Sequence, residues 1–185
     1  IKHNNNKDYW IITHKWNTAD YYVFPLTENG IGAPIISSIG SFHGNIWGTD
    51  NDEAIGYIQP SHDGAKIASA ICYRTENNIE IFDFNNNSGK LTHLLQFSSE
   101  GFAYGLCFSP DNRLLYVSFF TGNKGIVQYD LHSYSNKKGP IRENCISANL
   151  KDYSFGAVQL GPDGKLYIAR VDNYLDIIHH PNKKG

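Results

Sequence analysis

Three segments of the chain are variants of one motif: GYIQPSHDG (residues 56–64), GLCFSPDN (105–112) and GAVQLGPDG (156–164). Their first glycines lie 49 and 51 residues apart, so the motif returns with a period of about fifty residues. Each segment ends in Asp followed by Gly or Asn, residues that favour tight hairpin turns because they tolerate positive φ angles. The period predicts a protein built from repeated units, each with a hairpin turn at the same place.

Two strands are expected after each turn. The first is rich in β-branched and aromatic residues and covers residues 66–73, 114–120 and 166–171 in the three units. The second covers residues 79–84, 126–131 and 174–179. The same pair precedes the first motif, at residues 9–14 and 21–26, so the chain contains four units. We expect Gly56, Gly105 and Gly156 to begin equivalent innermost strands.

A weaker fourth strand can be placed at residues 34–39, 91–97 and 145–150. No stretch shows the apolar spacing of an amphipathic helix. Antiparallel units of about 40 to 50 residues with an Asp-Gly turn are typical of β-propeller blades. We therefore predict an all-β fold, a β-propeller fragment of about four four-stranded antiparallel blades. The expected blades are residues 1–40, 53–100, 102–150 and 153–185.

The first unit lacks most of its first strand, and the fourth unit stops after its third. A ring of blades closes only with a full complement, so we expect a larger parent propeller whose remaining blades are partners of this chain. The absence of methionine and of an initial signal region also favours a piece of a longer protein.

Charge and hydropathy exclude two classes of partner. Sixteen Lys and Arg residues stand against eighteen Asp and Glu residues, which is not the basic composition of a nucleic-acid-binding protein. The longest apolar run, residues 114–120, is far shorter than the roughly 18 residues of a membrane span. Cys72, Cys107 and Cys145 are too few and too far apart for a disulfide framework, and we predict that they are thiols.

Catalytic and metal-binding motifs are not evident. HExxH, GxSxG and Gly-rich phosphate loops are missing, so we assign no catalytic residue, no metal site and no cofactor. The turn aspartates are interpreted as turn-forming residues that bind their own backbone. The acidic cluster of Asp50, Asp52 and Glu53 leaves two alternatives open, a hard-cation site or a solvated loop.

The best candidate site is one rim of the ring. The second strand of every blade runs away from the Asp-Gly turn, so the ends of these strands and the loops after them build the opposite rim. Aromatic and Arg side chains there can stack on sugars, peptides or cations. The candidate ligand-binding residues are His14, Trp16, Tyr73, Arg74, Phe120, Arg170 and Asp172. The loops between units add His43, Trp47, Phe102 and Tyr153, and the alternative for each residue is packing between blades.

Four segments carry a family resemblance: AIGYIQPSHDG (54–64), IEIFDFNNNSGKL (79–91), YGLCFSPDNRLLYVS (104–118) and GAVQLGPDGKLYIAR (156–170). They resemble the WD-repeat-like propeller region of large Bacteroidetes surface proteins of the gliding-motility-associated, type 9 secretion class, which carry a type B sorting domain. The resemblance implies an extracellular or cell-surface location. It also implies a non-enzymatic binding or scaffold module whose rim contacts glycan, peptide or another surface protein.

A second resemblance supports an alternative function. The segments LLYVSFF (114–120) and GIVQYDL (125–131) are similar to the repeat of phosphogluconolactonase-like proteins. This favours a lactonase-type propeller hydrolase, which would need convergent charged groups at the mouth of the channel. Arg74, Arg170 and Asp172 are the candidates for that role. A purely structural spacer is the third possibility.

Overall fold

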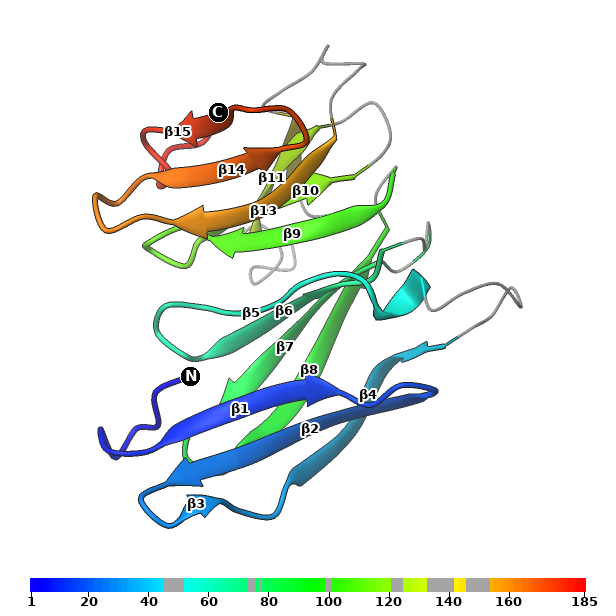
Figure 1. Ribbon diagram of the computed structural model, residues 1–185, viewed down its shortest axis with the longest axis vertical. Coiled ribbons are helices and arrows are strands. Elements are labelled where there is room, and N and C mark those ends of the chain that lie inside the picture. Colours follow the sequence, from blue (N-terminus) through cyan, green and yellow to red (C-terminus); the bar gives the residue numbers. More distant parts are fainter. Residues whose placement is uncertain are drawn as a thin grey trace.

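The computed structural model describes residues 1–44, 52–72, 76, 78–98, 101–120, 125–132, 142–145 and 154–185. These residues form four small antiparallel sheets that follow one another along the chain (Figure 1). The prediction of an all-β fold with four repeated units is confirmed. No helix among the described residues is long and apolar enough to cross a membrane.

The first sheet consists of β1 (Tyr9–His14), β2 (Thr18–Thr27), β3 (Gly30–Ile31) and β4 (Ile35–His43). Strand β2 pairs with all three of the others. Lys2 forms an isolated bridge with Tyr9, and the Trp10 N–H donates to the Ile1 carbonyl at 2.7 Å. Residues 1 and 2 therefore pair along β1, at the place expected from the sequence for the first strand of this unit.

The second sheet consists of β5 (Ile58–Pro60), β6 (Lys66–Ala70), β7 (Ile79–Asn85) and β8 (Lys90–Phe97). The third consists of β9 (Ala103–Phe108), β10 (Leu114–Phe119), β11 (Ile126–Asp130) and β12 (Arg142–Cys145). The fourth consists of β13 (Phe155–Leu160), β14 (Leu166–Arg170) and β15 (Leu175–Ile178). The second, third and fourth sheets pair neighbours in chain order, which is the meander of a propeller blade, whereas in the first sheet β4 pairs with β2 beyond the short β3.

Strand β12 differs from the expected position. The strand begins at Arg142, because Arg142 pairs with Asp130 at the end of β11, and it runs back along β11 to Cys145. The expected strand at 145–150 therefore lies too late in the sequence, and residues 146–150 are outside the described residues. A short 3-10 helix, η1 (Asp52–Ala54), precedes β5.

The hairpin turns are built as the motif predicts. The Ser61 hydroxyl donates to Asp63 Oδ1 at 2.6 Å, and that oxygen also accepts the Ala65 N–H. Ser109 and Asp111 repeat this arrangement in the third sheet. Asn112 adopts a φ of 60° where the other turns have glycine. The interpretation of the turn aspartates as turn-forming residues is confirmed.

The three glycines of the motif lie at the start of the innermost strands, as predicted. Gly105 is in β9, Gly156 is in β13, and Gly56 comes two residues before β5. Gly105 has no room for a side chain, because an added Cβ would lie 2.5 Å from the Gly156 carbonyl oxygen of the next sheet. The close approach of successive inner strands therefore requires glycine here.

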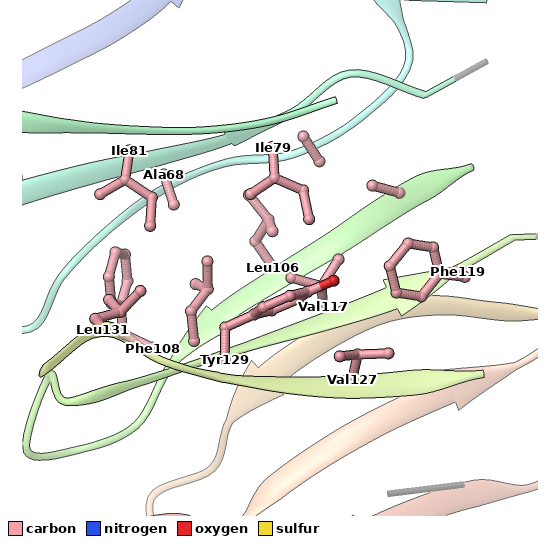
Figure 2. Packing of buried hydrophobic residues seen from close by; sticks show 13 residues of the cluster. Ala68, Ile79, Ile81, Leu106, Phe108, Val117, Phe119, Val127, Tyr129 and Leu131 are labelled. Atoms are coloured by element: carbon pink, nitrogen blue, oxygen red, sulfur yellow. The ribbon is translucent and has the colours of Figure 1, made fainter. Parts of the chain in front are cut away.

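Apolar side chains fill the space between successive sheets. Ile79, Ile81, Leu106, Phe108 and Val117 belong to the cluster between the second and third sheets (Figure 2). Similar clusters join the first sheet to the second and the third sheet to the fourth. The core is thus a series of boundaries between blades.

Two of the three cysteines are buried thiols, Cys72 and Cys107. Burial raises the pKa of the Cys107 thiol to about 11, so this side chain is neutral and behaves as a small apolar residue. The side chain of Cys145 lies outside the described residues, and its prediction as a thiol is not tested.

Candidate functional site

The ends of the second strands lie along one edge of the molecule. Strands β1, β6, β10 and β14 each leave a hairpin turn and run toward the edge opposite the turns (Figure 1). Antiparallel pairing places the beginning of each inner strand at the same edge. Side chains from four sheets can therefore meet a ligand on this rim.

A pocket of about 170 Å³ opens between the first and second sheets at this rim. His14 is the last residue of β1, and His43 is the last residue of β4. Trp16 follows β1, Glu53 comes from η1, and Ser69 lies on β6. All five line the pocket. Three of the residues predicted at the rim from sequence, His14, Trp16 and His43, are thus brought together.

The two histidine rings of the pocket are stacked. Their centroids are 3.7 Å apart and their planes differ by 13°. His14 pairs with Tyr21 across β1 and β2, and the Tyr21 ring meets the His14 ring edge-on at 4.6 Å. Because β1 and β4 flank β2, their last residues face each other over its first half. The stack is a product of strand register.

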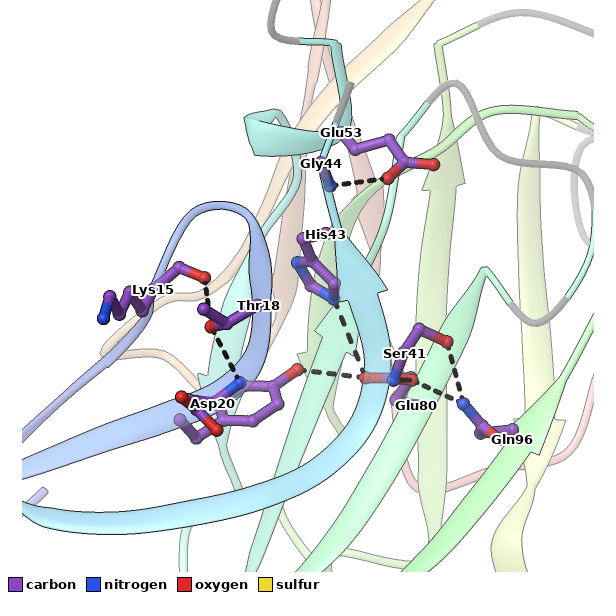
Figure 3. A network of polar contacts seen from close by, with 10 residues as sticks. Lys15, Thr18, Asp20, Ser41, His43, Gly44, Glu53, Glu80 and Gln96 are labelled. Carbon is purple, nitrogen blue, oxygen red and sulfur yellow. Dashed lines mark hydrogen bonds and ion pairs between the residues drawn. The ribbon is translucent and has the colours of Figure 1, made fainter. Parts of the chain in front are cut away.

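A buried carboxylate, that of Glu80, lies next to His43 (Figure 3). Glu80, on β7, is fully buried. It accepts hydrogen bonds from the Tyr21 hydroxyl at 3.0 Å, the Ser41 N–H at 2.7 Å and the Gln96 amide at 2.6 Å. His43 Nε2 is 3.9 Å from Glu80 Oε2.

Glu80 is ionised at neutral pH. Burial opposes its ionisation, but contacts with His43, Gln96 and Ser41 outweigh burial, and the pKa of Glu80 is lowered. Burial and the neighbouring Glu80 charge raise the pKa of Tyr21 well above its ordinary value, so Tyr21 stays a hydrogen-bond donor. The floor below the pocket therefore carries one negative charge.

His14 is neutral at pH 7. Burial, and secondarily the proximity of His43, lowers the pKa of His14 to about 4. Among the described residues that line the pocket, His14 Nε2, His43 Nε2 and Ser69 Oγ are buried without a hydrogen-bond partner. Unsatisfied buried polar atoms are rare in native proteins and indicate a place where a ligand or water binds. The residues that carry these buried atoms line the pocket from both sheets.

Among the other predicted site residues, those that the structure describes do not line this pocket. Arg170 pairs with Asp172 and, at 3.4 Å, with Asp176 in the fourth sheet, and its guanidinium lies 5.6 Å from the centre of the Tyr174 ring. Phe120 lies at the same rim on the third sheet. Tyr73 and Arg74, like Trp47 and Tyr153, are outside the described residues. Arg170 and Asp172 are thus bound to each other and do not join a groove with Trp16.

The acidic cluster expected near residues 50–53 is described only at Glu53. Glu53 Oε2 accepts the Gly44 N–H at 2.9 Å, and the residue is 6% exposed. Asp50 and the side chain of Asp52 are outside the described residues. Within the described part of the chain, no group of three His, Cys, Asp or Glu residues is placed to hold a metal ion. The Glu53 carboxyl group therefore binds the backbone N–H of the residue that follows β4.

Sequence reasoning missed Tyr21, Ser69 and Glu80. A signal was present, because Glu80 and Ser69 pair in the second sheet where Val127 and Val117 pair in the third. A carboxylate at a position where the next repeat carries valine marks a boundary that is not purely apolar. Only a comparison of repeats strand by strand would have found it.

Comparisons with known proteins support the fold. No protein-family model matches the chain, and no curated protein matches its sequence. The structure of a periplasmic gluconolactonase from Pseudomonas aeruginosa is similar, with a TM-score of 0.59 and 12% identity over 95% of this chain and 50% of that chain. A putative 6-phosphogluconolactonase from Bacteroides fragilis matches with a TM-score of 0.58 and 16% identity, over 94% of this chain and 50% of that chain.

A β-propeller domain from Myceliophteria thermophila matches with a TM-score of 0.53 and 13% identity, over 89% of this chain and 54% of that chain. The chain spans about half the length of these solved structures. At such low identity the likeness concerns the fold alone. The protein is an all-β β-propeller fragment of about four small antiparallel blades.

Proposed function

We propose that the chain is a non-enzymatic binding module whose rim pocket takes a glycan. The observation that carries this proposal is the set of unsatisfied polar atoms, His14 Nε2, His43 Nε2 and Ser69 Oγ, beside Trp16. A neutral imidazole offers one donor or one acceptor at each nitrogen, and a sugar hydroxyl can act as either. An indole adds a rigid apolar surface for the C–H face of a sugar ring.

The charges around the pocket favour a neutral ligand. His14 is neutral at pH 7, whereas Glu80 beneath the pocket and Glu53 on its wall bear carboxyl groups. An anionic ligand would meet repulsion from these carboxyl groups, and no Lys or Arg stands among the described residues of the wall. A neutral polyhydroxy compound satisfies the unpaired atoms without a charge penalty.

The proposal is tested on a glycan array, followed by titration of each hit. Trp16→Ala and Ser69→Ala should weaken binding at least tenfold, while Tyr9→Ala, an exposed aromatic at the far end of β1, should leave it unchanged. Arg170→Ala should also leave it unchanged, because Arg170 is held by its own carboxylates. Unaltered binding by Trp16→Ala, at equal thermal stability, would place the ligand elsewhere.

A lactonase-type hydrolase is the second candidate. Its support is the likeness in fold to a gluconolactonase and a putative 6-phosphogluconolactonase, together with the resemblance of residues 114–131 to that repeat. The test measures the hydrolysis of gluconolactone through the acid that the reaction releases, titrated at constant pH. Turnover faster than the spontaneous reaction, and lost in His14→Gln, would favour the enzyme over the binding module.

We further propose an extracellular or cell-surface location and contact with the remaining blades of a parent propeller. The location is supported by the Bacteroidetes gliding-motility resemblance and by the periplasmic source of one similar structure. The contact is supported by exposed apolar side chains on the two end sheets, Ile11 and Ile36 at one end and Leu175 and Ile177 at the other. A hydrophobic dye should bind to this chain by itself, and it should bind less to a longer chain that includes additional blades.

A further inference from the structure

A row of three aromatic rings lies at the rim, next to the pocket. The Tyr57 and Tyr104 rings are 5.6 Å apart, and the Tyr104 and Phe120 rings are 6.1 Å apart. Tyr57 precedes β5, Tyr104 lies at the start of β9, and Phe120 follows β10. We name these residues the aromatic row. None of its members lines the pocket of His14 and Trp16.

The aromatic row and the pocket share one strand. Gly56 and Ile58 line the pocket, and Tyr57 stands between them in the sequence. Tyr57 packs against the apolar cluster between the second and third sheets, so its side chain faces the third sheet. Its N–H donates to the Tyr104 carbonyl at 3.1 Å, which joins the inner strands of the two sheets. The segment from Gly56 to Ile58 therefore contributes both to the pocket and to the aromatic row.

The aromatic row is partly open to solvent. Phe120 is 37% exposed, and Tyr57 and Tyr104 are half-buried. The pocket and the aromatic row lie at successive boundaries between sheets, and packed sheets are separated by roughly 10 Å, close to the length of two sugar rings. A ligand that enters the pocket and continues along the rim would meet the row about two sugar units further on.

We propose that the aromatic row is a second subsite, and that the ligand is an oligosaccharide of about three or more rings. This inference rests on the proposed function of the pocket. The pocket binds one terminal sugar through His14, His43, Ser69 and Trp16. The aromatic row stacks against a later sugar and lends affinity to longer chains only.

The test compares a tetrasaccharide with its monosaccharide. An array that carries both forms of each glycan identifies the best tetrasaccharide, and titration calorimetry then measures both forms. Phe120→Ala should weaken the tetrasaccharide about tenfold and change the monosaccharide less than about twofold. Trp16→Ala should weaken both. Tyr174→Ala, an exposed aromatic of the fourth sheet outside the row, is the matched control and should change neither.

The outcomes separate the two proposals. If no glycan of the array binds, the proposed function of the pocket fails and the subsite fails with it. If Trp16→Ala weakens a glycan but Phe120→Ala leaves the tetrasaccharide unchanged, the pocket stands and the second subsite is overturned. Equal losses of both forms in Phe120→Ala would also overturn the subsite, because they would indicate an indirect effect on the pocket. Tyr104→Ala serves as a second variant of the row.

Discussion

The boundary between the first and second sheets differs from the boundary between the second and third. At the same position of the hairpin, Ser69 pairs with Glu80 in the second sheet, and Val117 pairs with Val127 in the third. Both pairs lie three residues after the first pair of the ladder. One boundary carries a buried carboxylate, and the other is filled with apolar side chains.

The difference shows that the repeat tolerates a polar boundary where that boundary supports a site. A buried charge costs stability unless its partners satisfy it, and apolar replacement of such a cluster is often neutral or stabilising. Glu80 instead holds Tyr21, Ser41 and Gln96 in place and lies within 3.9 Å of His43. The polar boundary is also the one that opens into a pocket.

The largest expected effect is at the apolar boundary. Phe108 is fully buried between the second and third sheets, and Phe108→Ala should lower the free energy of unfolding by about 3 to 5 kcal/mol. Urea denaturation measures the loss. Phe120→Ala, which removes the same ring from an exposed position, is the control and should lose less than about 1 kcal/mol. Equal losses would mean that the apolar boundary is not the main source of stability.

At the polar boundary, Glu80→Ala should lower the free energy of unfolding by about 3 kcal/mol, because Tyr21 and Gln96 are left without their acceptor. Glu80→Val combined with Tyr21→Phe copies the apolar boundary more closely and should lose less than the single substitution. Urea denaturation compares the two. A single variant as stable as the parent chain would show that Glu80 is not held by these partners.

The pH dependence should come from the polar boundary. The pKa of His14 is about 4 in the folded chain against an ordinary 6.5, so the unfolded chain binds more protons between these values. Stability is then full above pH 6.5 and should fall by about 1 to 2 kcal/mol as the pH drops toward 4. The lowered pKa of Glu80 acts at still lower pH, below its ordinary 4.5. Thermal melts across pH measure the fall, and His14→Phe should remove it between pH 6.5 and 4.

The smallest effect is expected at Lys66, in the first pair of the ladder of the second sheet. Lys66 pairs with Asp83 at 2.6 Å, but their side chains are 41% and 46% exposed, so Lys66→Ala should cost less than about 1 kcal/mol. Leu114 holds the same position in the third sheet and is fully buried. Leu114→Ala should cost about 2 to 5 kcal/mol in the same urea series. A larger loss for Lys66→Ala than for Leu114→Ala would contradict the expectation that an exposed ion pair contributes less than a buried leucine at the same ladder position.

Much of the fold could be predicted because its signals are local. The turn at Asp63 needs only Ser61 and the backbone two residues on, and the strands at 79–84 and 126–131 are readable from their side-chain pattern. Strand β12 was misplaced because its start is decided by pairing with Asp130, which a one-dimensional pattern does not contain. Local chemistry thus predicts turns and strands better than it predicts register.

The site depended on contacts between blades. His14 and Trp16 were predicted at the rim from strand direction, and the structure places both in one pocket. Arg170 was predicted there for the same reason, but carboxylates of its own sheet bind it first. Strand direction says which edge a residue reaches and does not say which neighbour it meets.

The repeat, the Asp-Gly turns and the all-β propeller class are determined by the sequence itself, because hydrogen bonds within a turn and alternation along a strand act over a few residues. The stacked His14 and His43, the ionised Glu80 and the pocket above them are decided only by tertiary structure. The two histidines and Glu80 come from three strands of two sheets. Their shifted pKa values, and the histidine nitrogens without a hydrogen-bond partner, are consequences of burial and close packing. Burial is a property of the packed blades and is absent from any single segment of the chain.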